Sequence, residues 1–258
     1  MEVPEVHLRQ RVKTIFFITQ DFSRLVFSVV GAIARKPLYF RELVLQMDLI
    51  GFQSIPIILL TGLFTGMVLA LQTAAQLEIF GATIYIGKVV ALSMIKELGP
   101  VLSSLMVAGR VGSGIAAELG SMVDTEQIDA MKVEGVDPIK KLVVPRLLAC
   151  MIMLPLLTVI SDSIGMIGGF LVAVRQLSID PVFYWRSSFD ILSIGDVMLG
   201  LVKPFIFGAI IALVSSYEGL NTHGGTVGVG RSTTSSVVMS SITILVMDFF
   251  ITKVFVYI

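Results

Sequence analysis

The stretch ALSMIKELGPVLSSLMVAGRVGSGIAAELGSM, residues 91–122, decides the fold of this chain. It is apolar enough to enter a membrane, yet it contains Lys96, Glu97, Arg110 and Glu118. A charge at membrane depth costs about 2.5–3.5 kcal/mol on insertion scales, so it persists mainly where it lines a cavity or meets a partner. The many Gly, Ala and Ser residues allow other helices to approach closely. We therefore expect this stretch to be a membrane span that carries function.

The composition of the whole chain agrees with a membrane protein. Of its 258 residues, 55% are hydrophobic and only 15% are charged, which is typical of an integral membrane protein. The net charge is zero, so no overall field indicates a nucleic acid partner. A single cysteine, Cys150, rules out a disulfide framework within the chain, and two histidines argue against a histidine-based metal site. We expect neither a metal nor a cofactor.

Long apolar runs predict five membrane-spanning helices, because about 20 apolar residues cross the hydrocarbon core. The predicted spans lie within Leu49–Leu77, at about Ile86–Ala117, within Leu147–Val174, at about Val197–Tyr217 and at about Val237–Tyr257. The predicted fold is an all-α integral membrane protein. Residues 1–48 form an N-terminal cytoplasmic or interfacial segment, and residues 49–258 form the five-span domain.

The segment Val12–Ala34 could be taken for a sixth span, since its apolar residues recur at helical spacing. Asp21 and Arg24 fall in its middle, however, and basic residues flank it on both sides. These features favour an amphipathic helix that lies in the membrane interface.

The distribution of Lys and Arg predicts the orientation of the chain. Twelve of these residues lie on the side of the N-terminus and three on the opposite side. Cytoplasmic loops carry the excess of positive charge, so the N-terminus is expected in the cytoplasm. Five crossings then place the C-terminus outside it.

The loop between the second and third spans predicts a short helix over Thr125–Glu134. Asp124 is a candidate N-cap, with Gln127 completing a capping box, and Gly135 can adopt the left-handed conformation that ends a helix. Ile128 and Met131 would share one face of this helix. The helix is either a solvated connector or a docking element for a cytoplasmic partner.

Several motifs together resemble the MlaE (YrbE) family of permeases. They are GLFTGMVLALQ at residues 62–72, the block from Lys96 to Met122, TEQIDAMKVEGVDP with the later VVPR, and SSITILVMDFFIT after Arg231. The resemblance covers roughly residues 35–258. It implies the permease subunit of an ABC transporter that moves phospholipids or related lipids between the inner and outer membranes, located as a multi-pass protein in the bacterial inner membrane. The family's expected partners are a second copy of the permease, a cytoplasmic ABC ATPase and a periplasmic ring of MCE-domain protein, with a STAS-domain subunit in some systems.

The resemblance also implies two groups of site residues. The expected lipid cavity at the homodimer interface involves Leu69, Leu77, Phe80, Lys96, Glu97 and Leu98. The expected ATPase coupling element involves Glu126, Ile128, Met131, Glu134 and Gly135.

Each assignment has a structural alternative. Lys96 and Glu97 could neutralise each other near the membrane surface, and the apolar cavity residues could face lipid or pack in the core. Asp248 could serve transport or form an ion pair with Lys203 or Lys253. The two GxxxG pairs, at residues 62–66 and 165–169, could reflect ordinary packing within the chain.

The chain itself is not expected to be an enzyme. GTVGVGRS at residues 225–232 has phosphate-loop spacing but carries Arg231 where the motif requires Lys, and no strand precedes it. ATP would therefore be hydrolysed by a partner chain. Two other functions remain open: a stand-alone secondary transporter that uses the intramembrane charges, and a non-transporting membrane scaffold for the periplasmic ring.

Overall fold

The computed structural model describes residues 3–33 and 39–257, and within these ranges every regular element is a helix. Five stretches there are long and apolar enough to cross a membrane: Phe40–Glu78, Thr83–Asp124, Ile139–Arg175, Ile194–Leu220 and Gly225–Phe255. They overlap all five predicted spans. The prediction of an all-α membrane protein with five spans is therefore confirmed.

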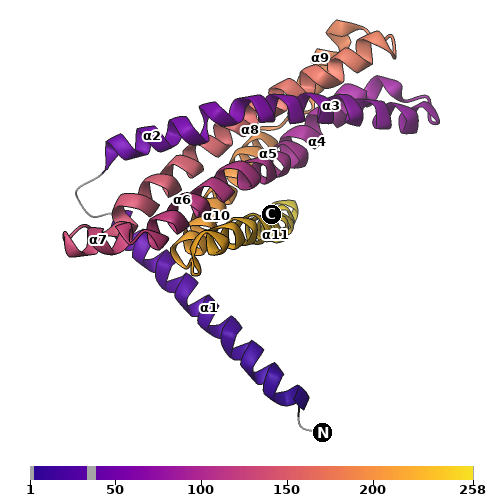
Figure 1. Cartoon of the computed structure of the whole chain (residues 1–258). Coiled ribbons are helices and arrows are strands. Elements are labelled where there is room, and N and C mark those ends of the chain that lie inside the picture. The colour runs from indigo at the N-terminus through magenta and orange to yellow at the C-terminus, as the bar shows by residue number, and fades with distance from the viewer. Residues whose placement is uncertain (1–2, 34–38, 258) are drawn as a thin grey trace.

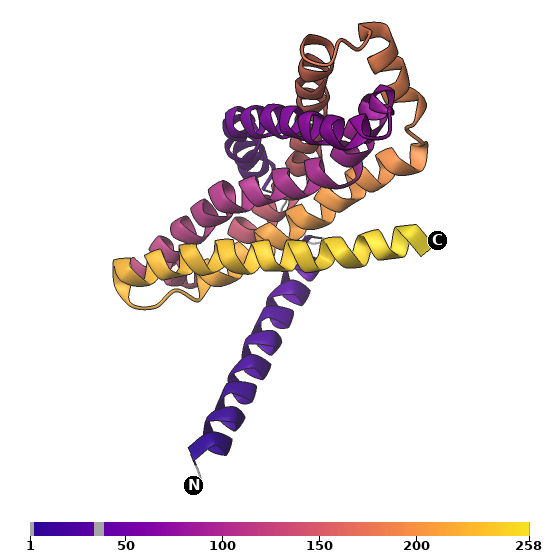
Figure 2. The same ribbon diagram turned by 90° about the vertical axis from the view of Figure 1, so that its right-hand side faces the viewer.

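Helix α1 (Val3–Ile33) projects away from the bundle in both views (Figures 1 and 2). Only its C-terminal part reaches the other helices, where Val29 and Ala32 are buried. Phe16, nearer the projecting end, is exposed, and so is Phe27 within the part that packs on the bundle. The segment predicted as an amphipathic helix is thus helical, and its position in the membrane interface stays a prediction.

A further helix, α2 (Phe40–Ile50), precedes the first predicted span. A single 3-10 turn, η1 (Phe52–Ser54), joins it to α3 (Ile55–Glu78). The sequence did not predict α2 as part of the first span, because Arg41, Glu42 and Asp48 interrupt its apolar residues.

Close glycine contacts join α3 to α8 (Val144–Arg175). A Cβ atom at Gly66 would collide with the backbone of Gly165, and one at Gly62 would lie 2.8 Å from the Ser161 carbonyl oxygen. Both GxxxG pairs therefore serve packing within the chain, as their structural alternative proposed. Small residues are what permit two backbones to approach this closely in a membrane.

The second span is not one regular helix. It consists of α4 (Ile86–Ser93), the π-helical segment η3 (Met94–Leu98), α5 (Gly99–Val107), a second π-helical segment η4 (Ala108–Gly112) and α6 (Ser113–Asp124). Pro100 has no backbone N–H, so the regular hydrogen bonding cannot pass through this point. The irregular segment η3 lies just before this proline. Segments of π-helix are frequent at functional sites, and these two carry Lys96, Glu97 and Arg110.

The loop helix α7 is shorter than predicted and spans Gln127–Val133. The predicted capping box is wrong, because Asp124 is the last residue of α6 and Glu126, in the left-handed conformation, occupies the N-cap. The predicted stop is confirmed: Gly135 has φ +75°. Its N–H donates to the Lys132 carbonyl, and the N–H of Val136 donates to the Met131 carbonyl, the pattern of a Schellman motif.

A short helix, α9 (Pro181–Asp190), follows α8 and packs against α4. The Ser188 hydroxyl donates to the Gly87 carbonyl at 3.0 Å across this contact. A reciprocal capping box of Ser193 and Asp196 starts α10 (Ile194–Leu220). The last helix, α11 (Gly225–Tyr257), begins 12 residues before the predicted fifth span and runs along one side of the bundle (Figure 2). Among the spanning stretches it is the least buried, so one face of it is open.

Candidate functional site

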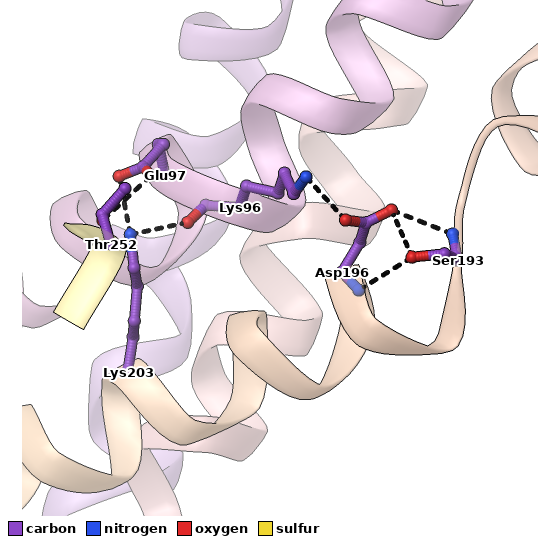
Figure 3. A network of polar contacts seen from close by, with 6 residues as sticks. All are labelled: Lys96, Glu97, Ser193, Asp196, Lys203 and Thr252. Carbon is purple, nitrogen blue, oxygen red and sulfur yellow. Dashed lines mark hydrogen bonds and ion pairs between the residues drawn. The ribbon is translucent and has the colours of Figure 1, made fainter. Parts of the chain in front are cut away.

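The π-helical segment η3 directs Lys96 and Glu97 to different partners (Figure 3). Lys96 Nζ lies 2.6 Å from Asp196 Oδ1, in the first turn of α10. Glu97 Oε2 accepts a hydrogen bond of 2.7 Å from Lys203 Nζ, further along α10. The alternative in which Lys96 and Glu97 neutralise each other is therefore wrong. Each of them neutralises a charge on α10 instead.

Lys203 is the centre of this network, and its side chain is fully buried. An ammonium group has three donors, and Lys203 Nζ has three oxygens within reach. Of these, Glu97 Oε2 at 2.7 Å and the Lys96 carbonyl oxygen at 3.0 Å accept hydrogen bonds, whereas Asp248 Oδ1 at 2.8 Å is an ion-pair partner that accepts no hydrogen bond. The predicted ion pair of Asp248 is thus confirmed with Lys203, whereas Lys253 is exposed. This arrangement satisfies a charge that could not be buried alone.

Thr252 on α11 completes the network by donating its hydroxyl to Glu97 Oε1 at 3.2 Å (Figure 3). Glu97 and Asp248 together face one ammonium group, so this part of the network has one negative charge in excess. The Glu97 side chain is 41% exposed and that of Asp248 only 19%. The excess charge is therefore presented outward at Glu97, and the network connects three spanning stretches of the chain.

An open apolar groove of about 380 Å³ lies beside this network. Its lining comes from α3 and from the last residue of η3, and consists of Phe64, Thr65, Val68, Leu69, Gln72 and Leu98. Two of the predicted cavity residues, Leu69 and Leu98, therefore lie together. Lys96 and Glu97 belong to the same π-helical segment as Leu98 but do not line the groove.

The other two predicted cavity residues do not line the groove. Leu77 packs, half-buried, against the smaller core cluster that includes Ala74 and Ile86, as Leu69 and Leu98 also do. Phe80 lies in the turn after α3 and is 80% exposed. Its role in a lipid cavity stays a prediction, and any covering partner would have to come from outside this chain.

On helix α7 the predicted coupling residues point in different directions. Ile128 is only 6% exposed, so it packs against its own chain, and Met131 is half-buried. Glu126 and Glu134 are exposed, as is Val133, which reaches 89% exposure. Val133 is therefore more accessible than Ile128 to a partner that docks on α7.

Two arginines hold together the half of the bundle that carries α7. Arg146, at the start of α8, is 3% exposed and pairs with Glu118 of α6 at 2.8 Å. Arg110, in η4, donates to Ser54 Oγ and Gln53 Oε1, both at 2.8 Å. The ion pair of Arg146 joins α8 to α6, on either side of the α7 loop. The hydrogen bonds of Arg110 join the second span to the turn before α3.

Sequence reasoning missed Asp196 and Thr252 and treated Lys203 only as a candidate partner of Asp248. Asp196 has a readable signal, because Ser193 three residues before it forms a capping box. Thr252 has none, because a hydroxyl in an apolar helix most often bonds its own backbone.

Comparison with known proteins agrees with this architecture. The family described as "Permease MlaE" matches residues 43–254. The chain belongs to the MlaE permease family. A Rickettsia felis protein named "Probable ABC transporter permease protein" is 47% identical over 235 residues, which cover 91% of each chain. The "Intermembrane phospholipid transport system permease protein MlaE" of Haemophilus influenzae is 36% identical over 246 residues, 94% of each chain.

A plant relative of this MlaE family member is also similar over most of the chain. The Arabidopsis thaliana protein "TRIGALACTOSYLDIACYLGLYCEROL 1, chloroplastic" is 38% identical over 227 residues, 88% of this chain and 65% of its own length. Membership of the MlaE family and the five apolar helices together make this chain a multi-pass membrane protein.

Proposed function

We propose that this protein is the permease subunit of an ABC-type system that transports phospholipids or related lipids between two membranes. Two relatives are named as ABC or phospholipid transport permeases, and both align over nine-tenths of the chain. The observation that carries the proposal is the apolar groove of Leu69 and Leu98 beside the π-helical segment with its charged network. Lipid tails need apolar area, and this groove offers it within the membrane-spanning region.

The groove is open on one side, so we propose that a second copy of the chain completes it. The exposed face of α11 supports this arrangement. Its apolar residues there are Val238, Met239, Ile242, Leu245, Val246, Phe249 and Phe250. Two copies would enclose an apolar cavity between them, and alternating exposure of that cavity would move the lipid.

The energy for transport would come from a cytoplasmic ATPase that contacts α7. Glu126, Val133 and Glu134 are among the exposed residues of this helix and its ends, and Gly135 fixes its end through a left-handed turn. Ile128 would support the contact from inside by anchoring α7 to its own chain, with Met131 half-buried beside it. The ion pair of Arg146 with Glu118 would carry the movement of the loop to α6 and α8.

The proposed location is the bacterial inner membrane, with the N-terminus in the cytoplasm and the C-terminus in the periplasm. The Lys and Arg distribution supports this orientation. A periplasmic MCE-domain ring above the groove, and in some systems a STAS-domain subunit, are the further partners that the family resemblance implies.

Transport in a reconstituted complex tests the proposal. Permease and ATPase are placed in proteoliposomes, and ATP-dependent movement of a fluorescent phospholipid to an acceptor is measured. Leu69→Trp would fill the groove, so transport should fall about tenfold while the complex still assembles. Leu156→Trp, on an exposed face of α8 outside the groove, is the matched control and should transport normally.

The outcomes separate the competing functions. Equal transport by Leu69→Trp and the control would remove the groove from the proposal. Transport that continues without the ATPase would favour a secondary transporter. An intact complex with no ATP-dependent lipid movement in the wild type would favour a scaffold.

A further inference from the structure

A second cavity lies between η3, α8, α9 and α10. It has a volume of about 400 Å³, within the range of small-molecule sites. Its wall is almost entirely apolar and comes from several elements, with Met166 on α8, Phe189 on α9, Val197 on α10 and Ile95 on η3. None of these residues lines the groove of Leu69 and Leu98.

Asp162 is the one ionisable residue in this wall. The residue is 9% exposed, and its Oδ1 atom is buried without a hydrogen bond partner. Among the described residues, no lysine or arginine pairs with it. The neighbouring Ser163 hydroxyl already donates to the Val159 carbonyl at 2.7 Å. The carboxyl group is therefore a polar group that the protein itself leaves unsatisfied.

Bilayer lipid that merely filled the cavity would not satisfy this carboxyl group. An acyl chain has no hydrogen bond donor, and an unpaired polar group in an apolar site is costly. Carboxylates within membrane helices are rare for the same reason and mark functional sites. The occupant that fits must therefore combine an apolar body with a hydrogen bond donor.

The depth of Asp162 within its membrane-spanning helix favours an uncharged hydrogen bond donor. Asp162 lies close to the middle of α8 (Val144–Arg175), far from both helix ends. A phosphate or ammonium group would have to be carried to that depth, and burying an ion costs far more than burying a hydroxyl group that finds a partner. A hydroxyl group can donate directly to a carboxyl oxygen.

We propose that the cavity between α8, α9 and α10 binds a hydroxyl-bearing neutral lipid, with its apolar body against Met166, Phe189 and Val197 and its hydroxyl group on Asp162. The site is separate from the groove and does not depend on the function proposed for it.

The position of Asp162 links this site to the charged network. A Cβ atom at Gly99 would collide with Asp162 Oδ1, so this oxygen packs against the junction of η3 and α5, and a lipid hydroxyl group in the cavity would donate to the other oxygen, Oδ2. Ile95, another wall residue, belongs to η3 itself. A bound lipid would thus contact the segment that carries Lys96 and Glu97.

Photolabelling of the full-length protein in lipid nanodiscs tests the proposal. The probe is a long-chain alcohol with a diazirine in its alkyl chain, and labelled peptides are identified by mass spectrometry. Labels should fall on residues 159–166 and 197–201. Dodecanol should compete about tenfold better than dodecyl methyl ether, which has the same chain but no donor. Equal competition by the two compounds would overturn the hydrogen bond to Asp162.

Four variants test which residues the labelling depends on. Asp162→Leu should reduce labelling about tenfold, and Asp162→Asn, which keeps an acceptor oxygen, should retain most of it. Val197→Trp fills the cavity without changing the carboxyl group and should also abolish labelling. Leu69→Trp, in the groove, should label as the wild type does. Undiminished labelling in both Asp162→Leu and Val197→Trp would overturn the site. A transport defect in Leu69→Trp alone would concern only the function proposed for the groove and would leave the Asp162 site unaffected.

Discussion

Lys203 and Glu97 form an ion pair of 2.7 Å although 106 residues separate them in the chain. The pair fixes α10 to the π-helical break in the second span, beside the groove proposed for lipid. Asp248 joins it from α11, so one buried ammonium group holds three spanning stretches together.

Replacing Lys203 with Met should destabilise the fold strongly. Glu97 and Asp248 would lose their cation, and removing one partner of a buried ion pair costs about 3–5 kcal/mol. Because Glu97 is half-exposed, we expect the lower end of this range. Thermal unfolding of the purified protein in detergent measures the effect. A Lys203→Met protein as stable as the wild type would show that the network contributes little to folding.

The triple variant Lys203→Met, Glu97→Gln, Asp248→Asn should recover much of that loss. With the carboxylates neutralised, no uncompensated charge stays buried, and such replacements are often close to neutral. The same unfolding measurement checks this prediction. Stability no better than that of Lys203→Met would mean that packing of the lysine side chain, rather than charge balance, is what matters.

Glu97 should couple energetically to Lys203 and not to Asp196. Residues in one ion-pair network show interaction energies of about 0.5–3 kcal/mol, whereas independent sites add within about 0.3–0.5 kcal/mol. Double-mutant cycles built from Glu97→Gln, Lys203→Met and Asp196→Asn measure both terms. A large coupling between Glu97 and Asp196 would contradict the separate pairing of Lys96.

Gly66→Ala should destabilise the contact of α3 with α8. The new Cβ would meet the backbone of Gly165, which cannot move aside as a flexible side chain could. Overpacking of this kind typically costs about 1–3 kcal/mol. The control is Gly31→Ala on α1, where nothing lies within 4 Å of the added atom. Equal unfolding temperatures for the two variants would be incompatible with the close helix contact.

Val133→Asp should weaken ATPase binding under the proposed coupling role. Val133 is 89% exposed, so the change leaves the fold of this chain intact but places a charge in the contact. An affinity pull-down of the ATPase at matched expression should recover about tenfold less partner. Equal recovery from Val133→Asp and the wild type would remove Val133 from the contact.

Ile128→Ala serves as the comparison for that experiment. Ile128 is buried within the chain, and truncating a buried isoleucine costs about 2–5 kcal/mol in stability. We expect a lower unfolding temperature, with any loss of ATPase following from it. Loss of the ATPase at unchanged stability would instead show that Ile128 itself enters the partner.

The sequence predicted the features that depend on local composition. The five spans follow from the length of the apolar runs. The left-handed stop at Gly135 also follows from one residue and its neighbours. The start of α7 could not be predicted in this way, because α6 continues through the expected cap, Asp124.

The sequence by itself thus determined the fold class and the number of spans. Only the tertiary structure decided that Lys96 pairs with Asp196, that Glu97 pairs with Lys203, and that Leu98 lines the groove while Phe80 does not. The reason is physical. Hydropathy and helix signals act over a few residues, whereas the partner of a buried charge depends on which distant helices lie side by side.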